Sequence, residues 1–499
     1  MLFSIIVASS SLILVYAWWA LIAARSSAQN HLPPGPPKLP IIGNIHLLDK
    51  MAPHRNLRNL ARKYGPIMHL QLGQVSTVVI SAPRLAEEVM KTQDLRFADR
   101  PTTTTSQIFF YKASNIAWAR YGHYWRQMKK ICTLELLSVK KSRSFYYIRE
   151  EELTDLLKFL DSSCGTPVVI RHQIQRMMNN VVSRATLGDI CKDRQYILDS
   201  ISTMFQSFNS FHMFNYYPRL GFMNVLTGKK AGWLKLQKGI DVILERLLEE
   251  HRRMSSSGST QDRNEDLIDV LLRIQKSGDH DLPITDDNIK AITLEMLTAG
   301  TSSSSMTTEW VMTEMMRNPE IRKKAQAEVR AVVKGNRVTE ADLQNLEYTK
   351  LVIKETLRLH GVPILVPREC REDCTVGGYH IPAKTMLLVN AFACATDPDS
   401  WEDPESFKPE RFKNSPIGFT GSNFEFIPFG AGRRICPGIN FGMGAVEFVV
   451  ANLLLHYDWK LPEGVKPEDI DMREITAIST LPIAPMHVVP LQPQLSKST

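Results

Sequence analysis

One stretch near the carboxyl end, Phe429–Gly438 (FGAGRRICPG), combines residue types that can bind a metal. Cys436 stands there among glycines and two arginines, directly before an apolar run that predicts a helix. The thiolate is the form of cysteine that binds metal, and nearby cations together with a helix amino terminus favour it. One soft anionic ligand in a glycine-rich loop suits the proximal side of a haem iron. The stretch therefore predicts a haem-thiolate site, and the alternative is a buried cysteine beside a helix cap.

The longest predicted element is a helix over Asp286–Arg317, about 48 Å long at the usual rise per residue. Two extended runs, Ile67–Leu72 and Thr77–Ser81, flank Gly73-Gln74 and predict a hairpin, and another short strand is expected at Thr385–Val389. The fold class is thus mainly α with a small β portion. Further helices are predicted at Pro83–Lys91, Glu150–Leu160, Gln173–Leu187, Ile197–Phe208, Lys229–Met254, Glu265–Lys276 and Glu320–Val333.

Composition indicates a folded chain: 499 residues with 43% hydrophobic side chains bury a large core. No flexible linker divides the chain after residue 40, so we expect one catalytic domain over 41–499. A net charge of +8 suits an anionic membrane surface or an acidic partner. The sequence has no dense basic tail, which argues against nucleic acid as the partner. The seven cysteines are odd in number and lack C-x-x-C pairs, which argues against a disulfide framework and favours a reducing compartment.

The amino-terminal segment 2–24 carries no charge and is long enough to span a bilayer as a helix. A cleaved signal peptide is the alternative, but no basic region precedes the apolar run. Positive charge after the span, beginning with Arg25, places the following domain on the cytoplasmic side. Segment 25–40 contains the proline-rich stretch Leu32–Pro37, which predicts a semi-rigid hinge.

The loop at Phe429–Gly438 closely resembles the haem-binding loop of cytochromes P-450, F-x-x-G-x-R-x-C-x-G. The anchor, the P-P-G-P-P run and F-A-D-R-P at Phe97–Pro101 resemble the plant microsomal A-type group, which oxidises terpenoids, alkaloids and phenolics. The resemblance covers essentially the whole chain and implies the cytochrome P-450 fold, a single large haem domain behind a transmembrane helix. It implies haem b with Cys436 as axial ligand, and O2 and a small lipophilic substrate (terpenoid first, alkaloid second). NADPH-cytochrome P-450 reductase, membrane lipid and an endoplasmic reticulum location with the domain facing the cytosol are implied as well.

Further motifs of the family match single residues of this chain and imply their functions. In the family a W-x-x-x-R run contacts the haem propionates; Trp125 and Arg126 are present here, and Lys129 stands where arginine is usual. E-x-x-R and P-E-R-F resemble the family's structural triad, here Glu355, Arg358 and Arg411. The cofactor-binding set expected from the resemblance is Cys436, Trp125, Arg126, Lys129, Arg434, Phe429 and Gly438, and a basic docking face for the reductase is expected from Arg126, Lys129, Lys130, Arg433 and Arg434.

The predicted long helix departs from the family at Ala299-Gly-Thr-Ser-Ser-Ser304. The family pattern A-G-x-[D/E]-T places an acid and an alcohol near iron-bound dioxygen; Ser303 retains a hydroxyl, whereas Ser302 replaces the acid. The nearest carboxylates on this helix, Glu295 and Glu309, are about two turns away. Three readings remain open: water relays in an ordinary hydroxylase, a reaction needing fewer protons (desaturation, coupling or rearrangement), or a weak oxidase without a substrate reaction.

Substrate contacts implied by the resemblance are nearly all apolar, which predicts a lipophilic substrate. Two competitors remain beside a monooxygenase: a haem-thiolate isomerase or dehydratase that needs no reductase, and a non-catalytic membrane haem-binding protein. The expected contacts are Ile108, Phe109, Phe110, Ile116, Leu297, Ala299, Ser303, Ile364, Leu365, Val366 and Ile478 to Leu481.

Overall fold

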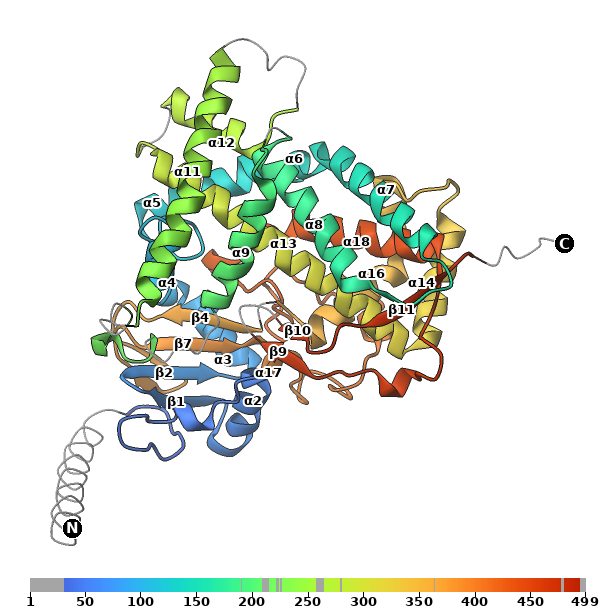
Figure 1. The fold of residues 1–499 in the computed structure, drawn as a ribbon. Coiled ribbons are helices and arrows are strands. Elements are labelled where there is room, and N and C mark those ends of the chain that lie inside the picture. The colour runs from blue at the N-terminus through green and yellow to red at the C-terminus, as the bar shows by residue number, and fades with distance from the viewer. Residues whose placement is uncertain are drawn as a thin grey trace, which may run out of the picture.

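The computed structural model describes residues 31–189, 191–208, 215–220, 224, 227–256, 264–278, 281–362, 364–476 and 480–493. The anchor predicted at 2–24 lies outside these residues. The described chain is mainly helical; the strands β1, β2, β4 and β7 lie together on one side of the molecule, and β11 lies towards the opposite side (Figure 1). The expected fold class, mainly α with a small β portion, is therefore confirmed.

The α-helices are α2 (Pro53–Tyr64), α3 (Pro83–Glu87), α4 (Thr104–Phe109), α5 (His123–Ile131), α6 (Val139–Ser144), α7 (Tyr146–Ser162), α8 (Ile170–Leu187), α9 (Arg194–Phe208), α11 (Lys229–Ser256), α12 (Leu267–Ser277), α13 (Asp286–Arg317), α14 (Pro319–Val332), α15 (Glu340–Gln344), α16 (Glu347–Leu359), α17 (Ala391–Ala395) and α18 (Ile439–His456). The helix predicted from Pro83 is divided, because α3 gives way to a π-helical turn, η2 (Glu88–Thr92).

The largest sheet has the order β1-β2-β7-β4, and its strands are β1 (Ile67–Leu72), β2 (Val75–Ile80), β7 (Met386–Asn390) and β4 (Leu365–Glu369). The predicted hairpin is confirmed: Leu72 pairs with Val75 across Gly73-Gln74, and Gly73 has a φ of +58° that glycine adopts without strain. The pairing of β2 with β7 is parallel and joins segments 300 residues apart. Smaller sheets contain β3 (Val168–Val169), β8 (Asp458–Lys460) and β11 (His487–Leu491), the pair β5 (Cys374–Val376) and β6 (Tyr379–Ile381), and the pair β9 (Glu474–Thr476) and β10 (Thr480–Pro482).

Helix α13 crosses the centre of the molecule with the bounds that the sequence predicted. Its start is fixed by a capping box, in which the Thr285 hydroxyl accepts from the Asn288 amide and the Asn288 side chain accepts from Thr285. It ends at Asn318, where Pro319 prevents continuation and opens α14. Most residues of α13 are buried, so this helix is the axis of the core.

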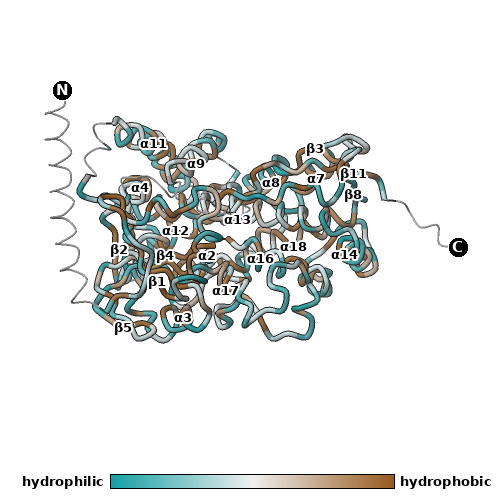
Figure 2. Tube along the Cα trace, turned by 90° about the horizontal axis from the view of Figure 1, so that it is seen from below, coloured by the Kyte–Doolittle hydropathy of each residue, from teal (hydrophilic) through white to brown (hydrophobic). Residues whose placement is uncertain are grey.

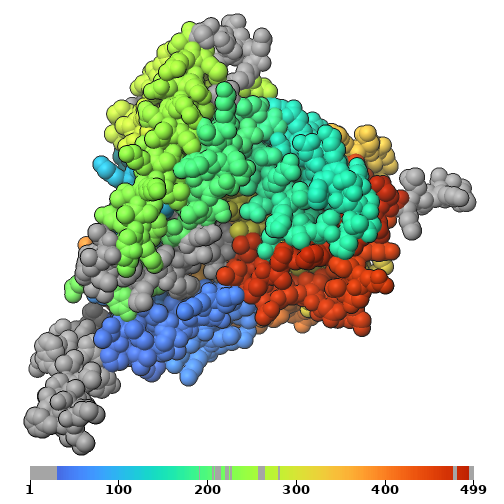
Figure 3. Space-filling view, viewed as in Figure 1, coloured from blue at the N-terminus to red at the C-terminus, as the bar shows by residue number. Residues whose placement is uncertain are grey.

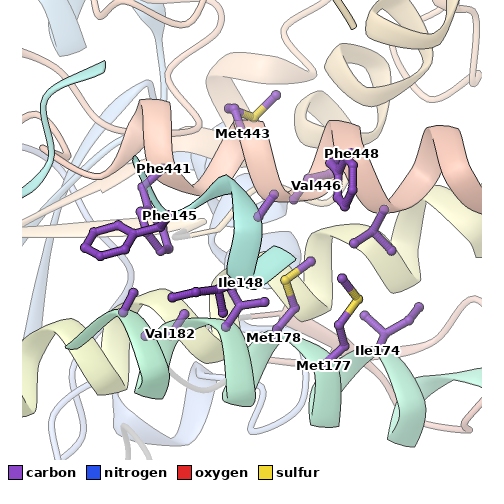
Figure 4. Packing of buried hydrophobic residues seen from close by; sticks show 14 of the residues in the cluster. Phe145, Ile148, Ile174, Met177, Met178, Val182, Phe441, Met443, Val446 and Phe448 are labelled. Carbon is purple, nitrogen blue, oxygen red and sulfur yellow. The ribbon is translucent and has the colours of Figure 1, made fainter. Parts of the chain in front are cut away.

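Helices α8 and α18 pack around α13 through apolar side chains. Figure 4 shows this packing, with Met177 and Met178 of α8 facing Val446 and Phe448 of α18. Helix α18 is long and apolar enough to span a bilayer, yet most of it is buried inside the domain, as a core helix would be. Figure 2 shows hydrophobic and hydrophilic stretches alternating along most helices, the pattern of helices with one buried face.

The amino-terminal and carboxyl-terminal strands lie side by side on one face, below the helices α8 and α11 (Figure 3). The contact contains a buried hydrogen bond, since Glu474 of β9 accepts from His54 Nε2 of α2 at 2.8 Å, and burial lowers the pKa of His54. Glu474 forms an ion pair with Arg55. Helix α2 and strand β9 are thereby joined to one another.

Candidate active site

The loop before α18 has the sharp turns that its glycines predicted. Gly432 has a φ of +66°, and a Cβ there would lie 2.0 Å from the Met90 carbonyl oxygen. Asp94 accepts a hydrogen bond from the Arg433 amide at 2.8 Å, and the Cys436 amide donates to the Phe429 carbonyl at 3.0 Å. These contacts hold the loop against η2 and present Cys436 ahead of the helix.

The Cys436 side chain is exposed although protein atoms surround it, which places the thiol at the wall of an internal space. Burial raises the pKa of Cys436, while a hydrogen bond from the Gly438 amide and the charge of Lys129 act in the opposite direction. The sequence analysis expected the two arginines and the helix amino terminus to favour the thiolate. Arg433 is exposed and Arg434 donates to main-chain carbonyls, whereas the groups that favour the thiolate in the structure are the Gly438 amide and Lys129. A metal ion that displaces the thiol proton would stabilise the thiolate further.

Three buried or partly buried guanidinium groups gather beside the loop: Arg100, Arg368 and Arg434. Burial, together with the other two cations, lowers the pKa of Arg100, and burial lowers the pKa of Arg368 to about 9 and that of Arg434 to about 10. Arg368 has no exposed surface, and its Nε and Nη1 have no hydrogen-bond partner among the described residues. A buried cluster of unpaired cations is costly unless an anion joins it. The two propionates of a haem fit this requirement, so the residues present are compatible with the cofactor that Cys436 predicted.

The predicted propionate contacts on α5 differ in their surroundings. Lys129 is half-buried and donates to the Ile435 carbonyl at 2.5 Å, directly beside Cys436. Trp125 is buried, and the Arg434 guanidinium lies 4.4 Å above its ring. Arg126 is exposed, with its guanidinium 5.7 Å from the ring centre of Tyr121. Arg126 therefore lies apart from the buried cations and suits an outer surface better than a propionate contact.

The three residues of the predicted structural triad meet in the core. Arg358 donates twice to the Glu355 carboxylate, both at 2.8 Å, and Arg411 donates to the same carboxylate at 2.9 Å. Glu355 and Arg358 have no exposed surface, and Arg358 also donates to the carbonyls of Ala395 and Pro404. Two cations and many main-chain acceptors share one carboxylate, which fixes the segments around the Cys436 loop.

The middle of α13 is left uncovered on one side. Ala299 is exposed and Ser302, Ser303 and Met306 are half-buried, whereas the neighbouring turns are buried. These four residues are three or four apart and share one face of the helix. Gly300 permits close packing with α8, because a Cβ there would lie 3.1 Å from the Val182 side chain.

The Ser303 hydroxyl donates to the Ala299 carbonyl at 2.7 Å, so its oxygen remains free to accept from water. The two nearest carboxylates of α13 are occupied elsewhere: Glu309 pairs with Arg171 at 2.7 Å, and Glu295 accepts from the amides of Ile116 and Ala117. Neither carboxylate is therefore placed to act beside Ser302, in agreement with the predicted separation of about two helical turns.

Glu295 is a site residue that the sequence did not identify as such. Its two hydrogen bonds, 2.8 and 2.7 Å, hold the segment before α5 onto α13, while the Ile116 carbonyl accepts from Trp125 and Arg434. Burial raises the pKa of Glu295 to about 7. Arg368 was also missed, although its inward position two residues after Val366 in β4 is a signal that strand alternation provides.

The predicted substrate contacts fall into distinct classes. Phe109, Leu297 and Val366 have almost no exposed surface and act as core residues. Ala299 is exposed on the uncovered face of α13, and Ile478 lies outside the described residues. Phe110, Ile116 and Ile364 are buried, and Ile108, Leu365 and Leu481 are half-buried.

Comparison with known proteins identifies the family. The family model described as Cytochrome P450 matches residues 33–488. The chain belongs to the cytochrome P450 family. It is 74% identical over 490 residues (98% of both chains) to a germacrene A acid 8-beta-hydroxylase of Helianthus annuus, and 61% identical over 492 residues (98% of both) to a costunolide synthase of Cichorium intybus. A zebrafish cytochrome P450 solved with abiraterone has the same fold, with a TM-score of 0.75 and 24% identity, covering 89% of this chain and 99% of that one.

Membership of the cytochrome P450 family makes the protein a haem-dependent monooxygenase. Like its family, this P450 uses O2, a redox partner and a lipophilic substrate. The family and its fold confirm haem, the cofactor expected from the Cys436 loop. These findings favour the monooxygenase over the non-catalytic alternative.

Proposed function

We propose that this P450 hydroxylates germacrene A acid at the 8-beta position. The observation that carries the proposal is the 74% identity, over 98% of both chains, with the sunflower enzyme of that name. A second relative with the same name, from Inula hupehensis, is 64% identical over 97% of both chains. The expected contact residues are apolar, which suits the hydrocarbon ring of such a substrate.

In this proposal Cys436 would hold the haem iron through its sulfur, and Arg100, Arg368, Arg434 and Lys129 would neutralise the propionates. When bound, the haem supplies the activation of O2 and the attack on an unactivated C–H bond. The protein selects the attacked carbon by orienting the substrate against the uncovered face around Ala299. The Glu355 triad keeps the Cys436 loop in place and takes no part in the chemistry.

Ser302 and Ser303 act in this proposal by ordering water. The Ser303 oxygen accepts a hydrogen bond while its proton is held by the Ala299 carbonyl. Ser302 lies on the same face and offers a second hydroxyl. Protons then reach the distal side through water rather than from a carboxylic acid of α13.

The redox partner in this proposal is NADPH-cytochrome P-450 reductase. Arg126, Lys130 and Arg433 are exposed and offer positive charge to an acidic partner. Segment 2–24 is proposed as a single membrane-spanning anchor, 25–40 as the hinge and 41–499 as the catalytic domain in the cytosol at the endoplasmic reticulum, in contact with membrane lipid.

The test is conversion of germacrene A acid by the full-length protein with a plant reductase in yeast microsomes. We expect NADPH-dependent formation of 8-beta-hydroxygermacrene A acid, identified by mass spectrometry and NMR. Costunolide as the main product would contradict hydroxylation at the 8-beta position. The activity would then be the one named for the costunolide synthases, which are 59–61% identical to this chain. A desaturated product, or one formed without NADPH, would overturn hydroxylation itself.

A further inference from the structure

Two cysteines lie in contact where β4 is followed by β5. Cys370 comes directly after β4, and Cys374 is the first residue of β5. Their sulfur atoms are 3.6 Å apart. The structure describes all seven cysteines, and among the described residues only this pair brings two sulfurs within hydrogen-bonding distance.

The two thiols are inequivalent. The Cys370 sulfur donates to the Glu372 carbonyl at 3.0 Å and lies 4.0 Å from the Ile381 carbonyl. Its hydrogen bond with Cys374, together with burial, raises the pKa of Cys370. The same hydrogen bond and the charge of Arg96 lower the pKa of Cys374, against burial and the charges of Glu372 and Asp373. Cys374 is therefore the better nucleophile of the pair.

Both cysteines are buried: Cys374 retains 7% of its surface and Cys370 none, so a small oxidant meets Cys374 before Cys370. Cys370 lines a surface pocket of about 340 Å³ whose wall also contains Arg96, Arg371 and Glu372. The three residues between the cysteines are exposed, so the turn has room to adjust. The sulfurs need to approach from 3.6 Å to about 2 Å for a disulfide.

We propose that Cys370 and Cys374 are a reversible oxidation site that hydrogen peroxide converts to a disulfide. The Cys374 thiolate attacks one peroxide oxygen; the S–O bond forms, the O–O bond breaks, and the leaving hydroxide takes up a proton as water. The Cys370 sulfur then attacks the sulfenic sulfur; the S–S bond forms, the S–O bond breaks, and a second water leaves. Two thiols are oxidised by two electrons and one peroxide is reduced to two waters.

The position gives the modification a local consequence. Cys370 is two residues from Arg368 and directly follows β4, the strand that contributes this cation to the candidate haem site. A haem monooxygenase that activates O2 without completing the substrate reaction releases peroxide, which is the oxidant that this proposal requires.

The test uses the full-length holoprotein in microsomes, treated with hydrogen peroxide, alkylated with N-ethylmaleimide and digested with trypsin. Arg371 lies between the cysteines, so trypsin releases 369–371 and 372–384 as separate peptides that only a disulfide holds together. We expect the joined pair to increase at least tenfold on peroxide treatment and to disappear with dithiothreitol.

Two variants make the result specific. Cys374→Ser should abolish the joined pair while keeping the carbon-monoxide spectrum of a thiolate-bound haem, which shows that the variant is folded. Cys394→Ser, at a buried cysteine whose pKa burial also raises, should leave it unchanged. Recovery of both wild-type peptides separately and fully alkylated after peroxide treatment, with the haem retained, would overturn the proposal, as would loss of the joined pair in Cys394→Ser.

Discussion

The haem-loop motif requires glycine at both 432 and 438, whereas the structure gives a steric reason for glycine only at Gly432. Gly432 adopts a φ of +66°, and an added Cβ would lie 2.0 Å from the Met90 carbonyl oxygen and 2.9 Å from an Asp94 oxygen. Gly438 has a φ of −87°, and its added Cβ would meet only the Cys436 sulfur at 3.7 Å, an ordinary contact. Gly432→Ala should therefore damage the loop, and Gly438→Ala should not.

The cost of Gly432→Ala follows from two terms. The left-handed conformation costs a residue with a Cβ about 1–2 kcal/mol. Relieving the overlap requires the loop and η2 to separate by more than 1 Å, judged against contacts that begin near 3.0 Å, and overpacking of this kind costs about 1–3 kcal/mol. Met90 is fully buried and gives little room. The sum of about 2–5 kcal/mol lowers the population of the native loop at least about thirtyfold.

The assay measures three quantities on microsomal or purified protein: haem bound per chain, the fraction with a thiolate-type carbon-monoxide spectrum, and the midpoint of thermal unfolding. We expect Gly432→Ala to lose most of the thiolate-type signal and to melt at a lower temperature, with Gly438→Ala close to the wild type. Equal losses in both variants would mean that motif position, and not backbone conformation and contact, decides the requirement. A Gly432→Ala protein with an unchanged spectrum and midpoint would refute the geometric reasoning.

Three further outcomes are expected. Glu355→Gln removes the buried carboxylate that Arg358 and Arg411 share and should lower the free energy of unfolding by about 3–5 kcal/mol; urea titration measures this, and a loss below about 1 kcal/mol would contradict it. His251 donates to the Leu247 carbonyl and to Asp266, and these contacts raise the pKa of His251 above 6.5. The stabilisation that His251 provides should be complete below about pH 6.5 and lost as the pH rises through the raised pKa. Melting temperatures of wild type and His251→Gln that change in parallel from pH 6 to 9 would contradict this expectation. Ser302→Asp should increase the fraction of NADPH consumed that appears as product, and unchanged coupling at equal haem content would show that water relays suffice.

Local pattern alone predicted much of the helical frame. The predicted run Asp286–Arg317 matches the bounds of α13, and the structure shows why a local pattern suffices: the Thr285 cap and Pro319 lie at its two ends, and caps and helix breakers act within a few residues. The hairpin around Gly73 followed from strand alternation and a turn residue, both of which are also local. The Cys436 loop and the residues of the Glu355 triad were found from motifs whose residue types bring their own chemistry.

Only the tertiary structure decided what surrounds those residues. The parallel pairing of β2 with β7 and the contact of Glu474 with His54 join segments that are hundreds of residues apart, and no local pattern encodes such pairings. The same holds for Arg368, whose unpaired nitrogens become evidence for an anion only when the strand is seen to be buried.

The sequence by itself determined that one cysteine stands in a haem-type loop, because identity and spacing of ligands are properties of the chain. It did not determine the protonation of Cys436, since burial and the distance to distant cations set that balance. Nor did it separate Arg126 from Lys129: residues three apart lie on neighbouring parts of one helix face, and only the fold shows that Arg126 is exposed while Lys129 is half-buried. Burial results from the packing of the whole chain. The residue types of the site could therefore be predicted from the sequence, whereas their pKa values and charge balance could be derived only from the tertiary structure.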